Sequence, residues 1–182
     1  MVFVGRLAEE KGVEELLRFR ANMGQADITL LLVGDGPDRK RLEVVAAELR
    51  LEAPDVVFAG MVPAEQVADW YRLGDLFVSA STSETQGLTY AEALAAGVPV
   101  LCRADACLLG VVRDGENGWQ YRSEADFRKK LDAFLTQPEC REAMRRAARE
   151  TGEEYSARRF AQRIEYIYDE QIQRNAIRRI PA

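Results

Sequence analysis

The chain has 182 residues, of which 47% are hydrophobic, and a formal net charge of -5. This length suits one well-packed domain or at most two small ones. The longest apolar run, LAAGVPVLC, is interrupted by a glycine and a proline and falls short of the roughly 20 residues that span a bilayer, so we expect no transmembrane helix. The first residues, MVFVGRL, lack the basic start and long apolar centre of a secretory signal, which predicts a cytoplasmic location.

A metal site is not expected. The sequence contains no histidine, and its three cysteines, Cys102, Cys107 and Cys140, lack the paired spacing of a zinc site. We interpret the cysteines as reduced thiols that are mostly buried.

Short β-branched runs alternate with segments of helical periodicity over the first hundred residues. The predicted strands cover residues 2–5, 28–34, 55–60, 75–81 and 98–103, and the predicted helices lie near 12–23, 37–50, 64–73 and 88–96. Strands that are apolar on both faces and separated by helices indicate a parallel sheet covered on both sides. The predicted fold is therefore α/β, with a doubly wound, Rossmann-like parallel sheet.

From about residue 123 onward the pattern is helical only. Ser123 and Ser156 are predicted N-caps, and Pro138 suits a first helical turn. The last helix needs a surface to pack on, because it carries an apolar stripe of Phe160, Ile164, Ile167, Tyr168 and Ile172. Its segment 158–179 holds six arginines against three acidic residues, a charge of +3. Such a segment could face an anionic lipid, nucleic acid or an acidic neighbouring domain, although a solvated helix face is commoner.

The loops that follow the strands are where such a sheet binds ligands. In FVGRLAEEKG, Gly5 lets the backbone approach a ligand, while Arg6 and Lys11 supply two cations suited to a diphosphate. Solvation of an ordinary surface explains these two cations equally well.

A second glycine-bearing loop, VGDGPDRK, begins like the dinucleotide fingerprint G-x-G-x-x-G. Gly34 and Gly36 match the first two glycines, but Arg39 replaces the third. A tight turn between strand and helix therefore explains both glycines better than a nicotinamide or flavin site does.

The segment TSETQGL should turn into a helix near Leu88. The free N–H groups of Gly87, Leu88 and Thr89 would then lie at the carboxyl edge of the sheet, an arrangement suited to phosphate. Carboxylates accept hydrogen bonds from sugar hydroxyls, so Glu84 and Glu92 suggest a nucleotide sugar. The alternative, which the spacing alone favours, is a loop residue at Glu84 and a solvated helix position at Glu92. The predicted buried face of this helix consists of Leu88, Ala91, Leu94 and Ala95.

The order of these motifs resembles a known family. The segments GRLAEEKG, LLLVGDGP, VVFAGMVP, DLFVSASTSETQGLTYAEALAAGVPVL and VRDGENGW are similar to the C-terminal, donor-binding half of retaining glycosyltransferases of the GT-B fold, in group 1 (family 4). The resemblance runs from residue 2 to about residue 170 and includes an intact E-x7-E motif. It implies a nucleotide-sugar (donor) binding domain over 1–154 and a C-terminal helix over 155–182 that packs on an N-terminal domain.

The resemblance also implies roles for individual residues. As catalytic residues, Arg6 and Lys11 would hold the donor diphosphate and stabilise its departure, and Glu84 would bind the hydroxyls of the transferred sugar. The remaining donor-binding residues would be Gly5, Met61, Val62, Thr85, Gln86, Gly87, Leu88, Thr89 and Glu92. Among them, Glu92 would accept from the ribose hydroxyls, and Met61 and Val62 would border the nucleobase. Transfer would retain the anomeric configuration without a tightly bound metal or a cofactor.

The chain departs from the family in what it lacks. Family members have an N-terminal half that supplies the acceptor site and usually a histidine near the reaction centre, whereas this sequence has no histidine and begins at the first strand of the donor domain. We therefore expect an excised domain that binds the donor nucleotide but transfers no sugar by itself.

The motif SETQGL resembles the branch that contains bacterial diacylglycerol glucosyltransferases. It favours UDP-glucose over GDP-mannose as donor and a lipid or saccharide as acceptor, with peripheral association of the full enzyme at the inner face of the membrane as an option and no nucleic-acid partner. Two alternatives remain: a non-catalytic module that binds nucleotide sugars, and a GT-B relative such as an epimerase or a phosphorylase.

Overall fold

Six parallel strands form one sheet in the part of the chain that this computed structural model describes, residues 1–24, 27–84 and 87–178. The strands are β1 (Val2–Val4), β2 (Leu30–Val33), β3 (Val56–Gly60), β4 (Phe77–Ser79), β5 (Val100–Arg103) and β6 (Gly118–Tyr121). Their order across the sheet is β3-β2-β1-β4-β5-β6, and every neighbouring pair is parallel. The predicted doubly wound, Rossmann-like sheet is confirmed.

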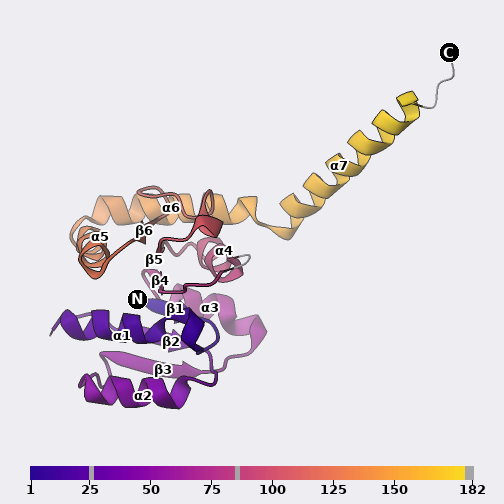
Figure 1. Cartoon of the computed structure of the whole chain (residues 1–182). Coiled ribbons are helices and arrows are strands. Elements are labelled where there is room, and N and C mark those ends of the chain that lie inside the picture. The colour runs from indigo at the N-terminus through magenta and orange to yellow at the C-terminus, as the bar shows by residue number, and fades with distance from the viewer. Residues whose placement is uncertain (25–26, 85–86, 179–182) are drawn as a thin grey trace.

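The chain changes its direction across the sheet between β1 and β4 (Figure 1). It moves outward from β1 to β2 and β3, and then returns to place β4 on the other side of β1. In open α/β sheets, ligands bind beyond the carboxyl ends of the strands at such a switch point. The loops after β1 and β4 therefore meet where a ligand site is expected.

Helices cover both faces of the sheet. The helices α1 (Val13–Asn22), α2 (Arg39–Glu48) and α5 (Glu124–Thr136) bury side chains in the core on one face, and α3 (Val67–Arg72) and α4 (Leu88–Ala95) do so on the other. The helix α6 (Pro138–Glu154) packs closely on α4. The two helices approach so closely at Gly152 that a side chain there would overlap the backbone of Ala95. Short 3-10 helices lie in the loops: η1 (Glu9–Lys11), η2 (Ala64–Gln66) and η3 (Ala106–Leu108).

Alternate side chains of the strands enter these two cores, because successive residues of a strand point to opposite faces. In β1, Phe3 joins the core under α1, whereas Val2 and Val4 join the core under α4. Both faces of the strand are thus buried, which explains why its sequence is apolar throughout.

The strand β6 was not predicted, and it lies at the edge of the sheet beside β5. Its sequence, GWQY, contains no β-branched residue and begins with a glycine. Gly118 is needed there, because a side chain would overlap the backbone of Val100. Pairing with β5 therefore specifies this strand more than its own sequence does.

The predicted helix starts in the C-terminal part are confirmed. The Ser123 hydroxyl accepts a hydrogen bond from the Asp126 N–H at 3.2 Å, and the Ser156 hydroxyl accepts one from the Arg159 N–H at 3.3 Å. Pro138 is the first residue of α6. The burial expected of the cysteines is only partly right. Cys102 is buried, Cys140 is half-buried, and Cys107 is exposed on the outer side of η3, whose Leu108 points into the core.

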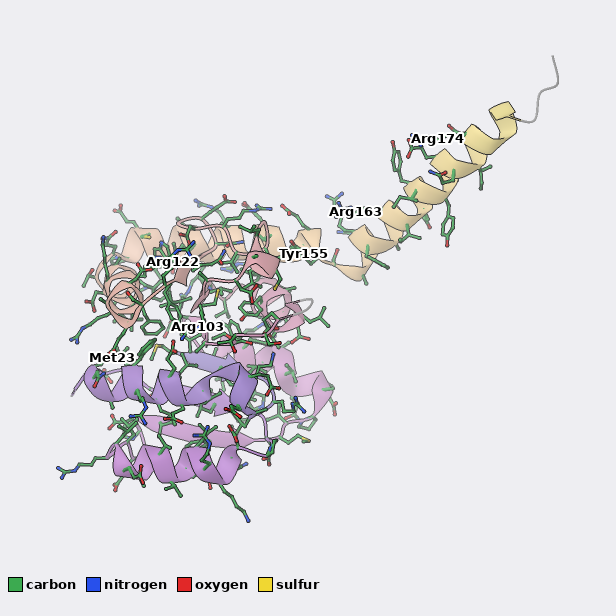
Figure 2. All side chains as sticks on the ribbon, viewed as in Figure 1. Met23, Arg103, Arg122, Tyr155, Arg163 and Arg174 are labelled. Carbon is green, nitrogen blue, oxygen red and sulfur yellow. The ribbon has the colours of Figure 1, made fainter. Side chains whose placement is uncertain are left out.

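The helix α7 (Ala157–Arg178) projects away from the body of the molecule (Figure 1). Figure 2 shows Tyr155 at the junction and Arg163 and Arg174 along the projecting helix. The predicted apolar stripe is uncovered by the described residues: Phe160 is 67% exposed and Ile164, its most protected member, is 37% exposed. Among the described residues, every helix is too short or too polar to span a membrane.

Candidate functional site

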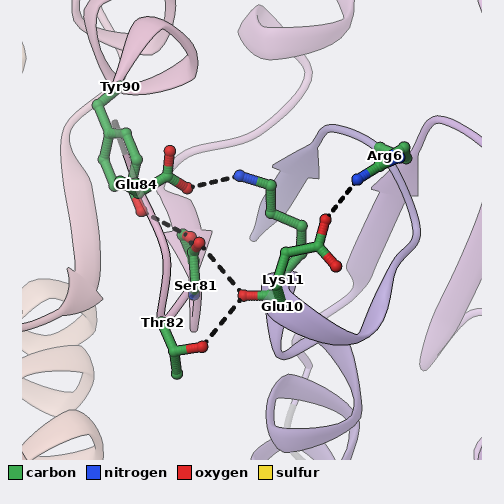
Figure 3. Close-up of polar contacts among 8 residues, drawn as sticks. Arg6, Glu10, Lys11, Ser81, Thr82, Glu84 and Tyr90 are labelled. Carbon is green, nitrogen blue, oxygen red and sulfur yellow. Dashed lines mark hydrogen bonds and ion pairs between the residues drawn. The ribbon is translucent and has the colours of Figure 1, made fainter. Parts of the chain in front are cut away.

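The loops after β1 and β4 are joined by hydrogen bonds that converge on one carbonyl group (Figure 3). The carbonyl of Glu10 accepts from the Thr82 N–H at 3.0 Å and from the hydroxyls of Ser81 and Thr82, each at 3.4 Å. Gly12 has a φ of 62°, and a side chain there would overlap the carbonyl of Ala80. The start of α1 therefore lies directly against the end of β4.

This contact brings together two of the three predicted catalytic residues. Lys11 Nζ lies 2.8 Å from Glu84 Oε1, and the two side chains are only 23% and 9% exposed (Figure 3). The ion pair thus spans the switch point, with its cation after β1 and its carboxylate after β4.

The third predicted catalytic residue, Arg6, has a different environment. Its guanidinium lies 2.6 Å from the carboxylate of Glu10, and its side chain is 66% exposed. Figure 3 shows Arg6 on the same loop as Lys11 but directed toward Glu10. The loop therefore carries one partly buried cation and one exposed cation. Gly5, which begins this loop, donates its N–H to Val33 of β2 at 3.0 Å.

The start of α4 lies at the same edge of the sheet. Gly87 precedes the helix with a φ of 61°, and its carbonyl accepts the first helical hydrogen bonds from the N–H groups of Tyr90 and Ala91. The N–H groups of Leu88 and Thr89 therefore have no partner within the helix, as is usual for the amides of a first helical turn. The predicted donor-binding residues Thr85 and Gln86 lie outside the described residues.

The predicted buried face of α4 is wrong except at Leu94. The buried residues are Tyr90, Ala93 and Leu94, whereas Leu88 is 63% exposed, Ala91 is half-buried and Ala95 is exposed. Tyr90 sets this orientation, because its hydroxyl donates to Ser79 Oγ at 2.8 Å and its ring packs edge-on against Phe77. A tyrosine with a polar partner on β4 thus takes the position facing the sheet.

Glu92 is on the outer side of α4 and is held by one hydrogen bond from α3. The hydroxyl of Tyr71 donates to Glu92 Oε2 at 2.9 Å. Burial and the nearby Glu92 carboxylate raise the pKa of Tyr71 above its ordinary range, so the hydroxyl keeps its proton and acts as the hydrogen-bond donor. Glu92 lines two hollows, one of about 320 Å³ between α3 and α4 and one of about 410 Å³ between α4 and α6.

The two residues that are predicted to border the nucleobase, Met61 and Val62, follow β3. Met61 is 80% exposed, and Val62 is half-buried against the core under α3 and α4. The predicted site residues that the structure describes therefore lie on three loops and on the helix α4.

The loop after β2 is filled by protein. A side chain at Gly34 would overlap the carbonyl of Gly5, and one at Gly36 would overlap the carbonyl of Leu7. The N–H of Leu7 donates to the Asp35 carbonyl, and the N–H of Asp38 donates to the Leu7 carbonyl, each at 3.0 Å. These contacts support the interpretation of both glycines as a tight turn.

Several residues that shape the site were not singled out from the sequence. Ser81, Thr82 and Gly12 join the two loops, and Tyr71 holds Glu92. The hydroxyl residues after β4 and the glycine before α1 are sequence features that could have indicated a close contact between the two loops. Tyr71 gave no such signal, because a tyrosine in a helix is usually part of the core.

Comparison with known proteins places the chain in a family. Residues 1–151 match the family described as Glycosyl transferases group 1. The chain is 33% identical over 171 residues to an alpha-monoglucosyldiacylglycerol synthase of Streptococcus pneumoniae, covering 92% of this chain and 38% of that protein. It is 37% identical over 131 residues to a GDP-mannose-dependent alpha-mannosyltransferase of Corynebacterium glutamicum, covering 72% of this chain and 29% of that protein.

Solved structures agree with this match. The sucrose-phosphate synthase from Thermosynechococcus elongatus has a TM-score of 0.81 and 26% identity, covering 94% of this chain and 45% of that chain. The chain thus spans less than half the length of each of these three proteins. The resemblance to GT-B glycosyltransferases is confirmed, and the chain belongs to the group 1 glycosyltransferase family.

Proposed function

We propose that this chain is the donor-binding domain of a retaining glycosyltransferase. The longer enzyme would move a hexose from a nucleotide-diphosphate sugar, with UDP-glucose favoured, to a lipid or saccharide acceptor. The observation that carries the proposal is the Lys11–Glu84 pair at the switch point between β1 and β4. It supplies a cation and a carboxylate where a sheet of this kind binds ligands, in a chain whose family transfers sugars.

The proposed chemistry divides the donor between the two loops. Negative charge accumulates on the leaving diphosphate as the bond to the sugar breaks, and Lys11 and Arg6 would stabilise that charge without a metal ion. Glu84, which already accepts a hydrogen bond from Lys11, would accept hydrogen bonds from hydroxyl groups of the transferred sugar through its remaining lone pairs. A lysine and an arginine on one loop suit a diphosphate, because their charges add.

The remaining donor contacts would come from the neighbouring loops and from α4. The N–H groups of Leu88 and Thr89 suit a phosphate oxygen, and we propose this role for the start of α4 together with Gly87. Glu92 would accept from the ribose hydroxyls, and Met61 and Val62 would border the base. Gly5, Thr85 and Gln86 complete the proposed donor site.

The names of two relatives support the proposed donor and acceptor. The name of the relative in S. pneumoniae indicates a glucosyl lipid, which favours a glucose donor and a diacylglycerol-type acceptor. The name of the relative in C. glutamicum indicates GDP-mannose, which makes that donor the second candidate. With a lipid acceptor, the longer enzyme would associate peripherally with a membrane.

We also propose that α7 packs on a further domain of a longer enzyme. Its apolar stripe is exposed along the described helix, and the curated relatives are more than twice the length of the segment that this chain matches. Burying Phe160 and the isoleucines of the stripe would stabilise that contact through the hydrophobic effect.

Calorimetric titration of this chain with UDP, GDP and ADP tests the binding proposal. We expect UDP to bind most tightly and Glu92→Ala to weaken UDP binding about 10-fold, because a carboxylate partner of two hydroxyls is lost. Glu43→Ala, which removes an exposed carboxylate on α2, is the matched control and should leave the affinity unchanged. Absence of binding to all three nucleotides would overturn the proposal.

A transfer assay tests the need for a further domain. This chain is incubated with UDP-glucose and diacylglycerol, and glucosyl lipid is measured. We expect no product, because the acceptor site would belong to the other domain. Product formed by this chain alone would contradict that part of the proposal.

A further inference from the structure

The two glutamates of the E-x7-E motif are held by different kinds of group. Glu84 pairs with a cation, Lys11, whereas Glu92 accepts a hydrogen bond from a neutral phenol, Tyr71, at 2.9 Å. The first partner belongs to the proposed donor site. The second belongs to α3 and has no role in the proposed function as stated above.

The core fixes the position of the Tyr71 hydroxyl. The residue is 1% exposed, and its ring lies 5.7 Å from that of Phe77 on β4, measured between centroids. Phe77 packs in turn on Tyr90, whose hydroxyl is bonded to Ser79. Because the ring of Tyr71 is buried in this cluster of aromatic rings, its hydroxyl is a donor at a fixed place at the edge of the core.

The hydrogen bond restricts a side chain that would otherwise be free. Glu92 lies on the outer side of α4, where a glutamate normally samples several rotamers at a cost in entropy when it binds a ligand. Tyr71 occupies Oε2, and no described residue is bonded to Oε1. The carboxylate is therefore oriented with one oxygen available beside the hollow between α3 and α4.

We propose that Tyr71 is a positioning residue that orients the Glu92 carboxylate to accept from the ribose hydroxyls of the donor nucleotide. This inference rests on the proposed function, in which Glu92 binds the ribose. The Tyr71 hydroxyl would donate to Oε2, while both ribose hydroxyls donate to the two lone pairs of Oε1. Tyr71 would thereby determine how well the site distinguishes a ribonucleotide from its deoxy analogue without touching the ligand.

The test compares UDP with 2′,3′-dideoxy-UDP in the wild type and in Tyr71→Phe. The measured quantity is the ratio of the two dissociation constants, which reports the ribose hydroxyls alone. We expect the wild type to favour UDP and Tyr71→Phe to reduce that preference about 3- to 10-fold, which is the effect of losing one typical hydrogen bond. In the Glu92→Ala background, Tyr71→Phe should cause no further reduction.

Tyr121→Phe is the matched control. Tyr121 is buried, and its hydroxyl donates to Glu15 on α1 at 2.8 Å, so the variant loses the same kind of hydrogen bond on the opposite face of the sheet. We expect it to leave the ratio unchanged. Only folded molecules bind, so the ratio is insensitive to partial unfolding. Should Tyr71→Phe not fold, Tyr71→Met is a second variant without the hydroxyl.

The outcomes separate this inference from the proposed function. If the wild type prefers UDP and Glu92→Ala abolishes the preference while Tyr71→Phe retains it, the role of Tyr71 is overturned and the proposed function stands. If the wild type binds both ligands equally, Glu92 does not bind the ribose and the role of Tyr71 fails with it. If the wild type binds neither ligand, both proposals fail.

Discussion

The loops after β2 and β4 look alike in sequence but have different structural roles. Each carries glycine, follows a buried strand at the carboxyl edge of the sheet and leads into a helix. After β2, the space beside Gly36 is occupied by the backbone of the neighbouring β1 loop. After β4, a side chain at Gly87 would meet a methyl group of Leu108 at 3.0 Å and the Tyr90 ring at 3.5 Å among the residues that the structure describes, and the loop carries Glu84 at the switch point.

This difference shows that a glycine pattern does not by itself indicate a phosphate site. A glycine lets backbone approach closely, and the approaching group can be a ligand or another loop of the same protein. In the β2 loop the approaching group is Leu7, so a dinucleotide would have no room there. In the β4 loop a side-chain charge pair adjoins the helix start, and ligand chemistry is therefore available.

Substitution of Gly36 should have the largest effect on stability. In Gly36→Ala, the new methyl group overlaps the Leu7 carbonyl, so the β1 loop must move. We expect the free energy of unfolding, measured by urea denaturation, to fall by about 3 kcal/mol. Nucleotide binding should fall with it, because the β1 loop also carries Lys11.

Gly87→Ala provides the comparison in the other loop. Its backbone is left-handed, which costs a residue with a side chain about 1 kcal/mol, and the Leu108 methyl group can shift. We therefore expect a smaller loss of stability than in Gly36→Ala. An equal or larger loss would show that the β4 loop is packed as tightly as the β2 loop.

Replacement of Lys11 should have an intermediate effect. Lys11→Met keeps the apolar stem but leaves the Glu84 carboxylate, which is 9% exposed, without its cation. We expect the free energy of unfolding to fall by about 2 kcal/mol, less than for a fully buried pair, and UDP affinity to fall about 10-fold. Denaturation and calorimetry measure the two effects.

Arg18→Met is the control for Lys11→Met. Arg18 also pairs with a glutamate, Glu14, but its side chain is 57% exposed. We expect a change in stability within about 0.5 kcal/mol and no change in UDP affinity. If the two variants behave alike, the pair at the switch point has no special role.

The sequence was sufficient to predict the sheet and the edge at which the candidate site lies. Runs such as ITLLLVG are apolar on both faces, and in a parallel sheet the polar residues after such strands collect at one edge. Lys11 and Glu84 are 73 residues apart in the chain, yet this rule places both of their loops at the same edge. The resemblance to the family then suggested a nucleotide sugar as the ligand.

The details that the sequence did not reveal depend on packing between elements. The rotation of α4 depends on a hydrogen bond between Tyr90 and Ser79, and the strand β6 depends on its pairing with β5. The contact between Tyr71 and Glu92 requires the relative placement of α3 and α4. Helical periodicity gives the spacing of side chains along one helix, but it does not say which neighbour each side chain meets.

Arg6→Gln should have the smallest effect on stability. The side chains of Arg6 and Glu10 are 66% and 37% exposed. Loss of this exposed ion pair should therefore change the free energy of unfolding by less than about 0.5 kcal/mol. If Arg6 binds the donor diphosphate, the same variant should nevertheless weaken UDP binding about 10-fold and reduce the dependence of that binding on salt.

Uridine distinguishes a phosphate contact of Arg6 from a general effect on the β1 loop. Uridine lacks the diphosphate, so its affinity should be the same in the wild type and in Arg6→Gln, whereas Gly36→Ala should weaken both ligands. Equal losses for UDP and uridine in Arg6→Gln would mean that Arg6 supports the loop and does not contact phosphate. A loss confined to UDP would instead show that an exposed cation of the β1 loop contributes to binding without contributing to stability, as a residue reserved for a ligand should.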